Sequence, residues 1–177
     1  QELIKIFLKI CVGINSLHIN NIIHRDIKPA NILITKKGDI KICDFGICKF
    51  LDYNKITNTM IGTPYFMSPE QMHSQYYDYK IDVWGIGCVL YYLLYKKYPF
   101  NGQSILHLKN NIKFKNPFIK KSTYNSINNK FHIEQILKEM FEKNKHKRLN
   151  LTMFLDNNVE LLKFYNIKTI NKKYLKY

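Results

Sequence analysis

The stretch from Ile22 to Ile34, IIHRDIKPANILI, most constrains the fold because it places charged side chains between two apolar runs. Isolated charges near a hydrophobic core are costly unless each one is paired or has a use. Pro29 lacks a backbone N–H and argues against a helix or a central strand through the middle of the stretch. The stretch therefore predicts a loop between two buried segments, with charged side chains that have a function.

Hydrophobic periodicity predicts a mostly helical chain. Apolar residues recur every three or four positions over residues 1–19, which indicates an amphipathic helix. Apolar runs on either side of Lys37-Gly38-Asp39 predict a β-hairpin with strands over 32–35 and 40–43. Further helices are expected near 80–95, 103–112, 132–142 and 150–164. We therefore expect a mainly α fold with a short β-hairpin.

Two segments show no convincing period. The first runs from Gly46 to Ser68, and a loop of this length inside a compact domain is usually functional or disordered. The second is the polar C-terminal end of the sequence. The expected organisation is one domain over residues 1–160 and a C-terminal extension or tail over 161–177.

The formal net charge of +15 does not by itself indicate a nucleic-acid-binding protein. The lysines are spread along the chain and arginine is nearly absent, whereas base recognition and phosphate binding favour arginine. Solvated lysines on the surface explain the charge better. The most apolar stretch, residues 81–95, contains Asp82 and is shorter than the roughly 20 residues of a membrane span. A buried core helix is expected there, and membrane association is disfavoured.

The four cysteines show no CxxC pair and no metal-ligand spacing; they are Cys11, Cys43, Cys48 and Cys88. Reduced thiols in an intracellular protein are the expected state. No signal peptide opens the sequence, so a cytoplasmic location is expected, with the nucleus as the alternative.

Three oxygen-bearing side chains lie around the predicted hairpin. Asp26 and Asn31 belong to the loop, and Asp44 follows the second strand. Oxygen ligands of this kind suit Mg²⁺, which takes a few protein ligands together with substrate phosphates. Lys28 lies two residues after Asp26, so in an extended segment both side chains point to the same side. A carboxylate beside a cation could hold a hydroxyl nucleophile and a transferring phosphoryl group together.

The motifs HRDIKPAN (24–31), DFG (44–46) and SPE (68–70), in this order, resemble the catalytic loop, metal motif and activation-segment end of protein kinases. The resemblance covers residues 1–160 and is to the C-terminal, mainly helical lobe of that family. A lone DxxxxN or DFG is usually an ordinary turn, but several motifs in order are far more specific. DIKPAN and GTPYFMSPE (62–70) resemble the Ser/Thr class. MSPEQM with IDVWGIGCVLYYLL looks most like NIMA-related kinases.

The resemblance implies a role for each matching residue. Asp26 looks like the catalytic carboxylate that orients the substrate hydroxyl, and Lys28 would stabilise charge on the moving phosphoryl group. Asn31 and Asp44 would hold the Mg²⁺ ions that bridge the phosphates of ATP. The other implied roles are nucleotide binding by Leu33 and Cys43, shaping of the hydroxyl pocket by Thr63, and apolar packing by Phe45.

The only two arginines, Arg25 and Arg148, are informative because lysine is otherwise favoured in this chain. By resemblance, Arg148 pairs with Glu70 through a bidentate guanidinium fork; the alternative is surface charge in KNKHKR. Asp82 would accept hydrogen bonds from the backbone of His24 and Arg25, and the His24 side chain would pack towards the core.

Thr59 lies three residues before Gly62, where the family carries an activating phosphothreonine. Phosphorylation would add negative charge, which Arg25 and Lys49 would receive. An ordinary loop threonine is the alternative, and Thr57 is a weaker candidate.

The sequence contains no counterpart of the Gly-rich loop, strand lysine and glutamate-bearing helix of the family's N-terminal lobe. The only GxG, Gly85-x-Gly87, lies inside the predicted buried helix and indicates helix packing. We expect this chain alone to bind ATP weakly and to transfer phosphate poorly, with an N-terminal lobe upstream and an exposed hairpin without it. The alternatives are a catalytically silent scaffold that docks substrates and, less favoured, a basic nucleic-acid binder.

Overall fold

The computed structural model describes residues 1–44, 49–50, 64–73, 76–120 and 132–169, and every structural statement below concerns these residues. They form a mostly helical fold with a short antiparallel hairpin, as expected, and a second short strand pair. None of the helices in these ranges is both long enough and apolar enough to cross a lipid bilayer.

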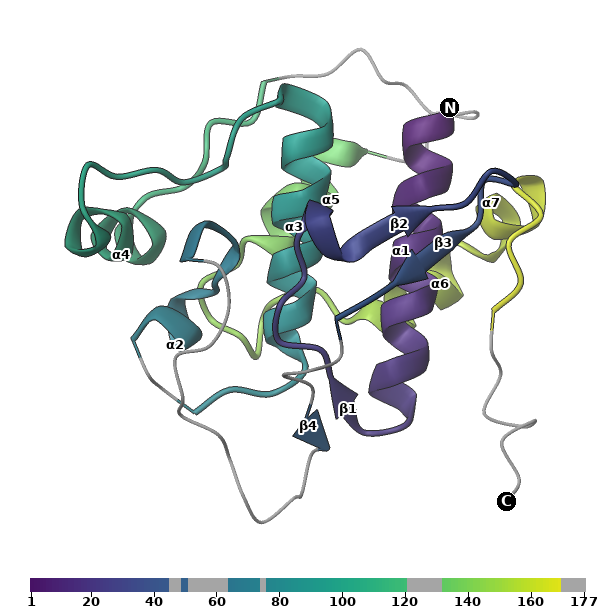
Figure 1. Ribbon diagram of the computed structural model, residues 1–177, viewed down its shortest axis with the longest axis horizontal. Helices are drawn as coiled ribbons and strands as arrows, with labels where there is room; N and C mark the ends of the chain where they lie inside the picture. Colours follow the sequence, from purple (N-terminus) through teal and green to yellow (C-terminus); the bar gives the residue numbers. More distant parts are fainter. Residues whose placement is uncertain (45–48, 51–63, 74–75, 121–131, 170–177) are drawn as a thin grey trace.

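Two long helices, α1 (Glu2–Ile19) and α3 (Lys80–Tyr95), form the centre of the fold and pack against each other (Figure 1). The shorter helices are α2 (Pro69–Met72), α4 (Ile105–Phe114), α5 (Ile133–Met140), α6 (Leu151–Asn157) and α7 (Val159–Phe164). In Figure 1, α2 and α4 lie to the left of α3, and α6 lies beside α1.

Two pairs of short strands complete the fold. β2 (Ile32–Ile34) and β3 (Ile40–Ile42) form the predicted antiparallel hairpin, and β3 packs on α1. Gly38 turns the hairpin with a φ of 76°, a conformation that favours glycine. β1 (Ile22–Ile23) pairs with β4 (Lys49–Phe50). The sequence did not indicate this second pair, because strands of two residues are too short to show an alternating pattern.

The central helix α3 is buried along most of its length, as its apolar sequence predicts. Trp84 is fully buried and stacks on Phe100, with ring centroids 5.4 Å apart. A Cβ atom at Gly85 would lie 2.8 Å from Cβ of Ile27, and one at Gly87 would also meet close neighbours. The glycine pair therefore lets other elements approach α3, and it brings the middle of the charged loop onto this helix.

One expectation for the C-terminal part is wrong. The single helix expected over 150–164 is two helices, α6 and α7, which meet at Asn158. The side-chain amide of Asn158 donates to the carbonyl oxygen of Phe154 at 2.7 Å and competes with the helical backbone ladder. Within the expected extension over 161–177, Leu162 is buried and Ile167 packs against the same core.

Candidate active site

The charged loop between β1 and the 3₁₀ turn η1 (Pro29–Asn31) is attached to α3 by one buried carboxylate. The backbone N–H groups of His24 and Arg25 each donate to Asp82 at 2.9 Å, one to each carboxylate oxygen. Asp82 lies in the first turn of α3 and is 1% exposed. The contact that the sequence predicts for Asp82 is present, and it fixes the start of the loop on the central helix.

Arg25 has a backbone conformation that residues other than glycine rarely adopt. Its φ is 73°, and a residue held in this region costs about 1–3 kcal/mol unless its surroundings enforce it. Besides Asp82, Gln71 of α2 holds this residue by donating from Nε2 to the Arg25 carbonyl oxygen at 3.3 Å. The loop is therefore constrained from two helices, which is what a preorganised site requires.

Asp26, Lys28 and Asn31 form one hydrogen-bonded group. Nζ of Lys28 lies 2.5 Å from Oδ2 of Asp26, and Nδ2 of Asn31 donates to Asp26 O at 2.8 Å and to its Oδ2 at 3.2 Å. Lys28 has an extended backbone, so its side chain lies on the same side as that of Asp26, as predicted. Asp26 and Asn31 are buried, whereas Lys28 is partly exposed.

A second set of hydrogen bonds joins the loop to the hairpin. The N–H of Asp26 donates to Nδ1 of His24 at 3.4 Å, and Nε2 of His24 lies 3.0 Å from the carbonyl oxygen of Cys43. Because a carbonyl oxygen only accepts, Nε2 carries the proton. The N–H of Cys43 donates to the carbonyl oxygen of Asn31 at 3.0 Å. Asp44 follows Cys43 directly, so the same bonds bring Asp44 to the loop.

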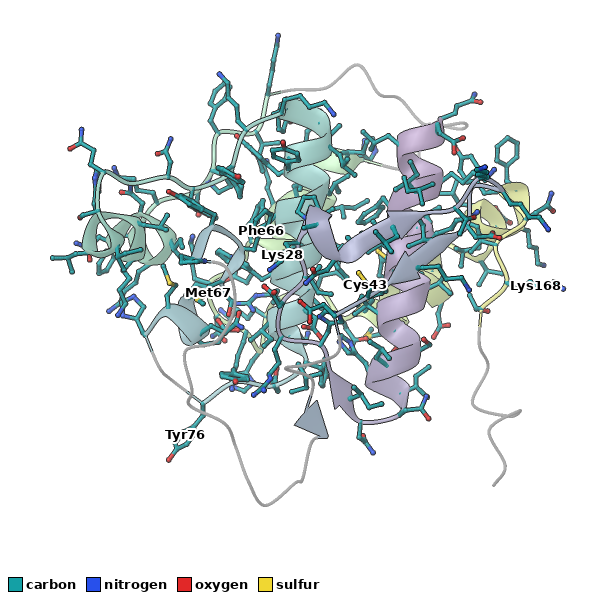
Figure 2. All side chains as sticks on the ribbon, in the orientation of Figure 1. Lys28, Cys43, Phe66, Met67, Tyr76 and Lys168 are labelled. Carbon is teal, nitrogen blue, oxygen red and sulfur yellow. The ribbon has the colours of Figure 1, made fainter. Side chains whose placement is uncertain are left out.

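The segment around η3 (Pro64–Phe66) packs against the other side of the loop. Phe66 and Met67, labelled in Figure 2, line a narrow cavity together with Asp26. The chain just before α2 therefore contributes one wall of the site.

Asn31 and Asp44 are the residues that could hold a divalent cation. The amide nitrogen of Asn31 is bonded to Asp26, so its amide oxygen remains as the ligand atom. Asp44 is exposed, with a φ of 67°. One amide oxygen and one carboxylate fit Mg²⁺, which takes few protein ligands together with phosphates. In the part of the chain that the structure describes, no group of three or more His, Cys, Asp or Glu could hold a metal ion.

The residues expected to contact a nucleotide lie on the hairpin. Leu33 and its neighbour Ile34 are 52% and 58% exposed, which is unusual for large apolar side chains. The side chain of Cys43 is partly buried and its thiol is free. The buried thiols of Cys11 and Cys88 are different, because burial raises the pKa of each and makes them unreactive.

Arg148 and Glu70 form the bidentate pair that the sequence predicts. The Nη1–Oε1 and Nη2–Oε2 distances are 2.6 and 2.9 Å, and both residues are buried. The guanidinium also donates to the carbonyl oxygens of Lys80 at 3.0 Å and Glu142 at 2.9 Å. Arg148 therefore ties the start of α2 to α3 and to the segment after α5.

Four residues at the site were missed by the sequence reasoning. His18 of α1 lies 2.9 Å from Asp82, Tyr77 accepts a 3.3 Å hydrogen bond from Arg25, and Lys80 donates to Leu149 O at 3.1 Å. The fourth is Gln71, which also completes a capping box with Ser68. His18, Gln71 and Lys80 lie on helices and Tyr77 lies just before α3. A polar residue in such a position does not by itself identify a partner.

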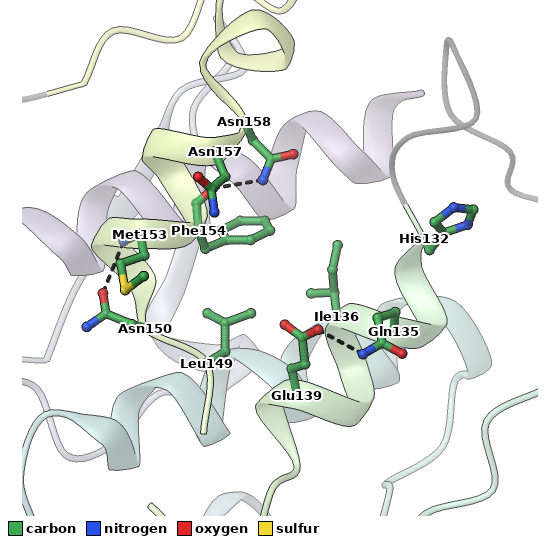
Figure 3. Close-up of a pocket in the computed structure, with 10 residues that line it drawn as sticks. All are labelled: His132, Gln135, Ile136, Glu139, Leu149, Asn150, Met153, Phe154, Asn157 and Asn158. Carbon is green, nitrogen blue, oxygen red and sulfur yellow. Dashed lines mark hydrogen bonds between the residues drawn. The ribbon is translucent and has the colours of Figure 1, made fainter. Parts of the chain in front are cut away.

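Some predicted residues lie outside the described part of the chain. Thr59, Thr63 and Phe45 belong to this group, as does the side chain of Lys49, whose backbone forms β4. A separate cavity of about 360 Å³ between α5 and α6 (Figure 3) contains none of the candidate catalytic residues. It is lined by polar groups such as Gln135, Glu139 and Asn157 around Phe154.

Comparison with known proteins identifies the family. Residues 1–159 match the family model described as protein kinase domain. The chain is 45% identical over 93 residues to G2-specific protein kinase fin1 from Schizosaccharomyces pombe, which is 52% of this chain and 13% of that protein. It is 37% identical over 142 residues to serine/threonine-protein kinase Sgk1 from Homo sapiens, covering 80% of this chain and 32% of that protein.

Sgk1-B from Xenopus laevis is 38% identical over 141 residues, with 79% of this chain and 31% of that protein covered. The chain thus spans about a third or less of the length of these relatives. The residues matched by the family model include Asp26, Lys28 and Asn31, and also the Glu70–Arg148 pair. On this evidence the chain belongs to the protein kinase family.

Proposed function

We propose that this chain is the C-terminal lobe of a serine/threonine kinase that transfers a phosphoryl group from ATP to protein hydroxyls. The observation that carries the proposal is the group formed by Asp26, Lys28 and Asn31 on a loop fixed to α3. Family membership and the Ser/Thr kinases among the relatives support it.

Asp26 would orient the substrate hydroxyl and accept its proton late in the reaction. A carboxylate is a weak base, so positioning contributes more than early proton abstraction. Nζ of Lys28, 2.5 Å from Asp26, would stabilise charge on the transferring phosphoryl group. Before substrate binds, the two charges compensate each other, which lowers the cost of burying the Asp26 carboxylate.

Asn31 and Asp44 would hold Mg²⁺ with ATP. When bound, the metal neutralises charge on the phosphates. The bond from the Asn31 amide to Asp26 keeps the metal ligand and the hydroxyl-orienting carboxylate in a fixed relation. Leu33 and Cys43 would lie against the nucleotide.

An N-terminal lobe would cover the exposed side chains of Leu33 and Ile34 and supply the remaining phosphate contacts. Residues 1–160 would be the C-terminal lobe, and this chain alone would bind nucleotide weakly. The motifs MSPEQM and IDVWGIGCVLYYLL support placement among NIMA-related kinases. We propose a cytoplasmic location on the grounds of the sequence alone.

Thr59 would be the activating phosphorylation site, with Arg25 and Lys49 as receivers of the phosphate. The Arg25 guanidinium contacts the hydroxyl of Tyr77 at 3.3 Å. A phosphate would compete well with this neutral acceptor, because charge-assisted hydrogen bonds are stronger. Thr63 would shape the pocket for the substrate hydroxyl.

The proposal is tested by phosphoryl transfer from labelled ATP to a mixture of Ser/Thr and Tyr peptides, using the complete protein with its N-terminal lobe. We expect label on Ser or Thr only, and a loss of about 10²–10⁴-fold in kcat for Asp26→Asn. Asp39→Asn, on the exposed hairpin turn, is the matched control. Undiminished transfer by Asp26→Asn, or label on Tyr, would refute the proposal. Nucleotide binding without transfer would favour the silent scaffold.

A further inference from the structure

One long stretch of the chain carries charge of a single sign. Residues 83–133 contain eight lysines and no aspartate or glutamate, although the whole chain has 13 acidic residues. Six of these lysines lie in the described part, and most are exposed: Lys96, Lys97, Lys109, Lys113, Lys115 and Lys120. They surround α4 and the connections on either side of it.

The same region exposes large apolar side chains. Leu106, Phe114 and Phe118 are 69%, 73% and 80% exposed. Leu108 and Ile112 of α4 point into the core. By helical periodicity Leu106 lies on the opposite side with Lys109 and Lys113. We refer to Leu106, Lys109, Lys113, Phe114 and Phe118 as the α4 face.

The segment after α4, which carries Phe118, is bonded to α3. The hydroxyl of Tyr91 donates to the carbonyl oxygen of Phe118 at 2.9 Å, and that of Tyr95 donates to Lys120 O at 3.1 Å. Nζ of Lys113 lies 5.1 Å from the ring centroid of Phe114. The two tyrosine hydrogen bonds fix the backbone from which Phe118 projects, which lowers the entropic cost of binding at this position.

A neighbouring cavity adds a concave element to this surface. It has a volume of about 660 Å³ and lies between residues 116–119 and the end of α5. Its lining includes Phe118 and Phe141, and one acid, Glu142, beside Lys138 and Lys143. An apolar side chain of a partner could insert there. A flat lipid surface could not fill such a cavity.

The positive charges act on a nearby histidine. His73 follows α2, and burial together with the charges of Lys113 and Lys109 lowers its pKa. The α4 face therefore carries a positive potential that another side chain experiences. α2 packs against α4, and Gln71 of α2 bonds to the candidate catalytic loop, so this surface is one element away from the site.

We propose that the α4 face binds an acidic protein segment in which aspartates and glutamates alternate with apolar side chains. The carboxylates would pair with Lys109 and Lys113, and the apolar side chains would pack on Leu106, Phe114 and Phe118. The further step, that such a segment belongs to a protein substrate, rests on the kinase activity proposed above.

Charge and shape disfavour the other occupants. Residues 170–177 contain three lysines and no acid, so this chain's own C-terminal end would be repelled, as would the same face of a second copy. Nucleic acid usually recruits arginine, and residues 83–133 contain none. The combination of exposed apolar anchors with lysines favours an acidic polypeptide.

Binding is tested with the 177-residue chain in the absence of nucleotide. The probe is a short fluorescein-labelled peptide that alternates Glu and Asp with Leu and Phe, and fluorescence anisotropy reports its affinity. A second peptide has Gln and Asn in place of the acids. We expect the acidic peptide to bind at least about tenfold more tightly than the neutral one, and less tightly as salt increases.

Two double variants should each weaken binding at least about tenfold: Lys109→Glu with Lys113→Glu, and Leu106→Ser with Phe114→Ser. The control is Lys36→Glu with Lys37→Glu, which makes the same charge change on the exposed hairpin turn. An equal loss in this control would mean general attraction to a basic protein and would overturn the proposal. Binding that ignores the loss of Leu106 and Phe114 would overturn it as well.

Circular dichroism checks that each variant is folded, and Lys109→Gln with Lys113→Gln provides a milder pair. A single-stranded RNA oligomer and phosphatidylserine vesicles are titrated in parallel. If either binds through the same lysines more tightly than the peptide, the face belongs to that class of partner and the proposal fails.

A kinetic experiment separates this proposal from the kinase proposal. The complete protein is given a short Ser peptide, alone or extended by the acidic segment. We expect KM to fall several-fold on extension, and the fall to disappear in Lys109→Glu with Lys113→Glu while the short peptide reacts as before. Equal KM values would reject docking of substrates, whereas absence of transfer to both peptides would reject only the kinase activity.

Discussion

The loop over residues 24–31 and the α4 face use charge in opposite ways. In the loop, Asp26 contacts Lys28, and the buried Asp82 accepts two backbone N–H groups. On the α4 face all charges are positive and none has a carboxylate nearby in sequence. Buried pairs fix geometry at a cost in desolvation, whereas exposed charges add little stability but create a potential at a distance. The first arrangement suits positioning of reacting groups, and the second suits attraction of a partner.

The largest effect is expected where a buried charge loses its partner. Arg148→Met would leave Glu70 buried without a counter-charge and should lower the free energy of unfolding by about 3–5 kcal/mol. Lys113→Met on the α4 face should change it by less than about 0.5 kcal/mol. Urea unfolding followed by circular dichroism measures both. Similar small changes in the two variants would show that the internal pair does not constrain the fold.

Asp82→Asn should have the next largest effect. The substitution removes the charge that accepts from His24 and Arg25 and that contacts His18, so the unfolding free energy should fall by about 1–3 kcal/mol. Because Arg25 then loses support for its φ of 73°, phosphoryl transfer by the complete protein should fall as well. Asp78→Asn, near the same end of α3, is the control for the charge change. Retained activity in Asp82→Asn would show that Gln71 alone holds the loop.

Lys143 is a partly buried cation, so its burial lies between that of the loop charges and that of the exposed lysines. Burial is the main cause that lowers the pKa of Lys143 from 10.5 to about 8, and the charge of Arg148 is the second. Between these values the unfolded chain keeps a proton that the folded chain has lost, so stability should rise with pH across that window. The free energy of unfolding of the wild type relative to Lys143→Met should therefore increase from about pH 8 towards pH 10.5. Lys138→Met, on the exposed side of α5, should show no such trend.

The smallest expected effect is a change in the pKa of His73, which lies near the lysines of the α4 face. Replacing Lys109 and Lys113 by Gln removes two of the causes that lower the pKa of His73, so this pKa should rise. Burial remains the first cause, so it should not return fully to 6.5. A pH titration followed by NMR of the His73 ring measures the change. An unchanged pKa would mean that solvent screens the lysines completely.

Local patterns in the sequence predicted the parts of the fold that depend on near neighbours. Helix α1 and the hairpin around Gly38 follow from periodicity and turn chemistry, and the bounds of α4 and α5 lie close to those expected. The partners of Asp82 and Arg148 came from motif resemblance, not from periodicity. The β1–β4 pair was missed because it joins strands of only two residues, and the break at Asn158 because one side-chain hydrogen bond leaves no periodic signal.

The sequence by itself determined which chemical groups this protein has: a carboxylate and an ammonium two residues apart, two oxygen ligands near a hairpin, and a long stretch of lysines without acids. Only the tertiary structure decided which of these groups act together. Asp82 lies 58 residues from His24 in the chain, and they meet because Gly85 lets the loop approach α3. Contacts between distant segments depend on how whole helices pack, whereas local propensity acts over a few residues.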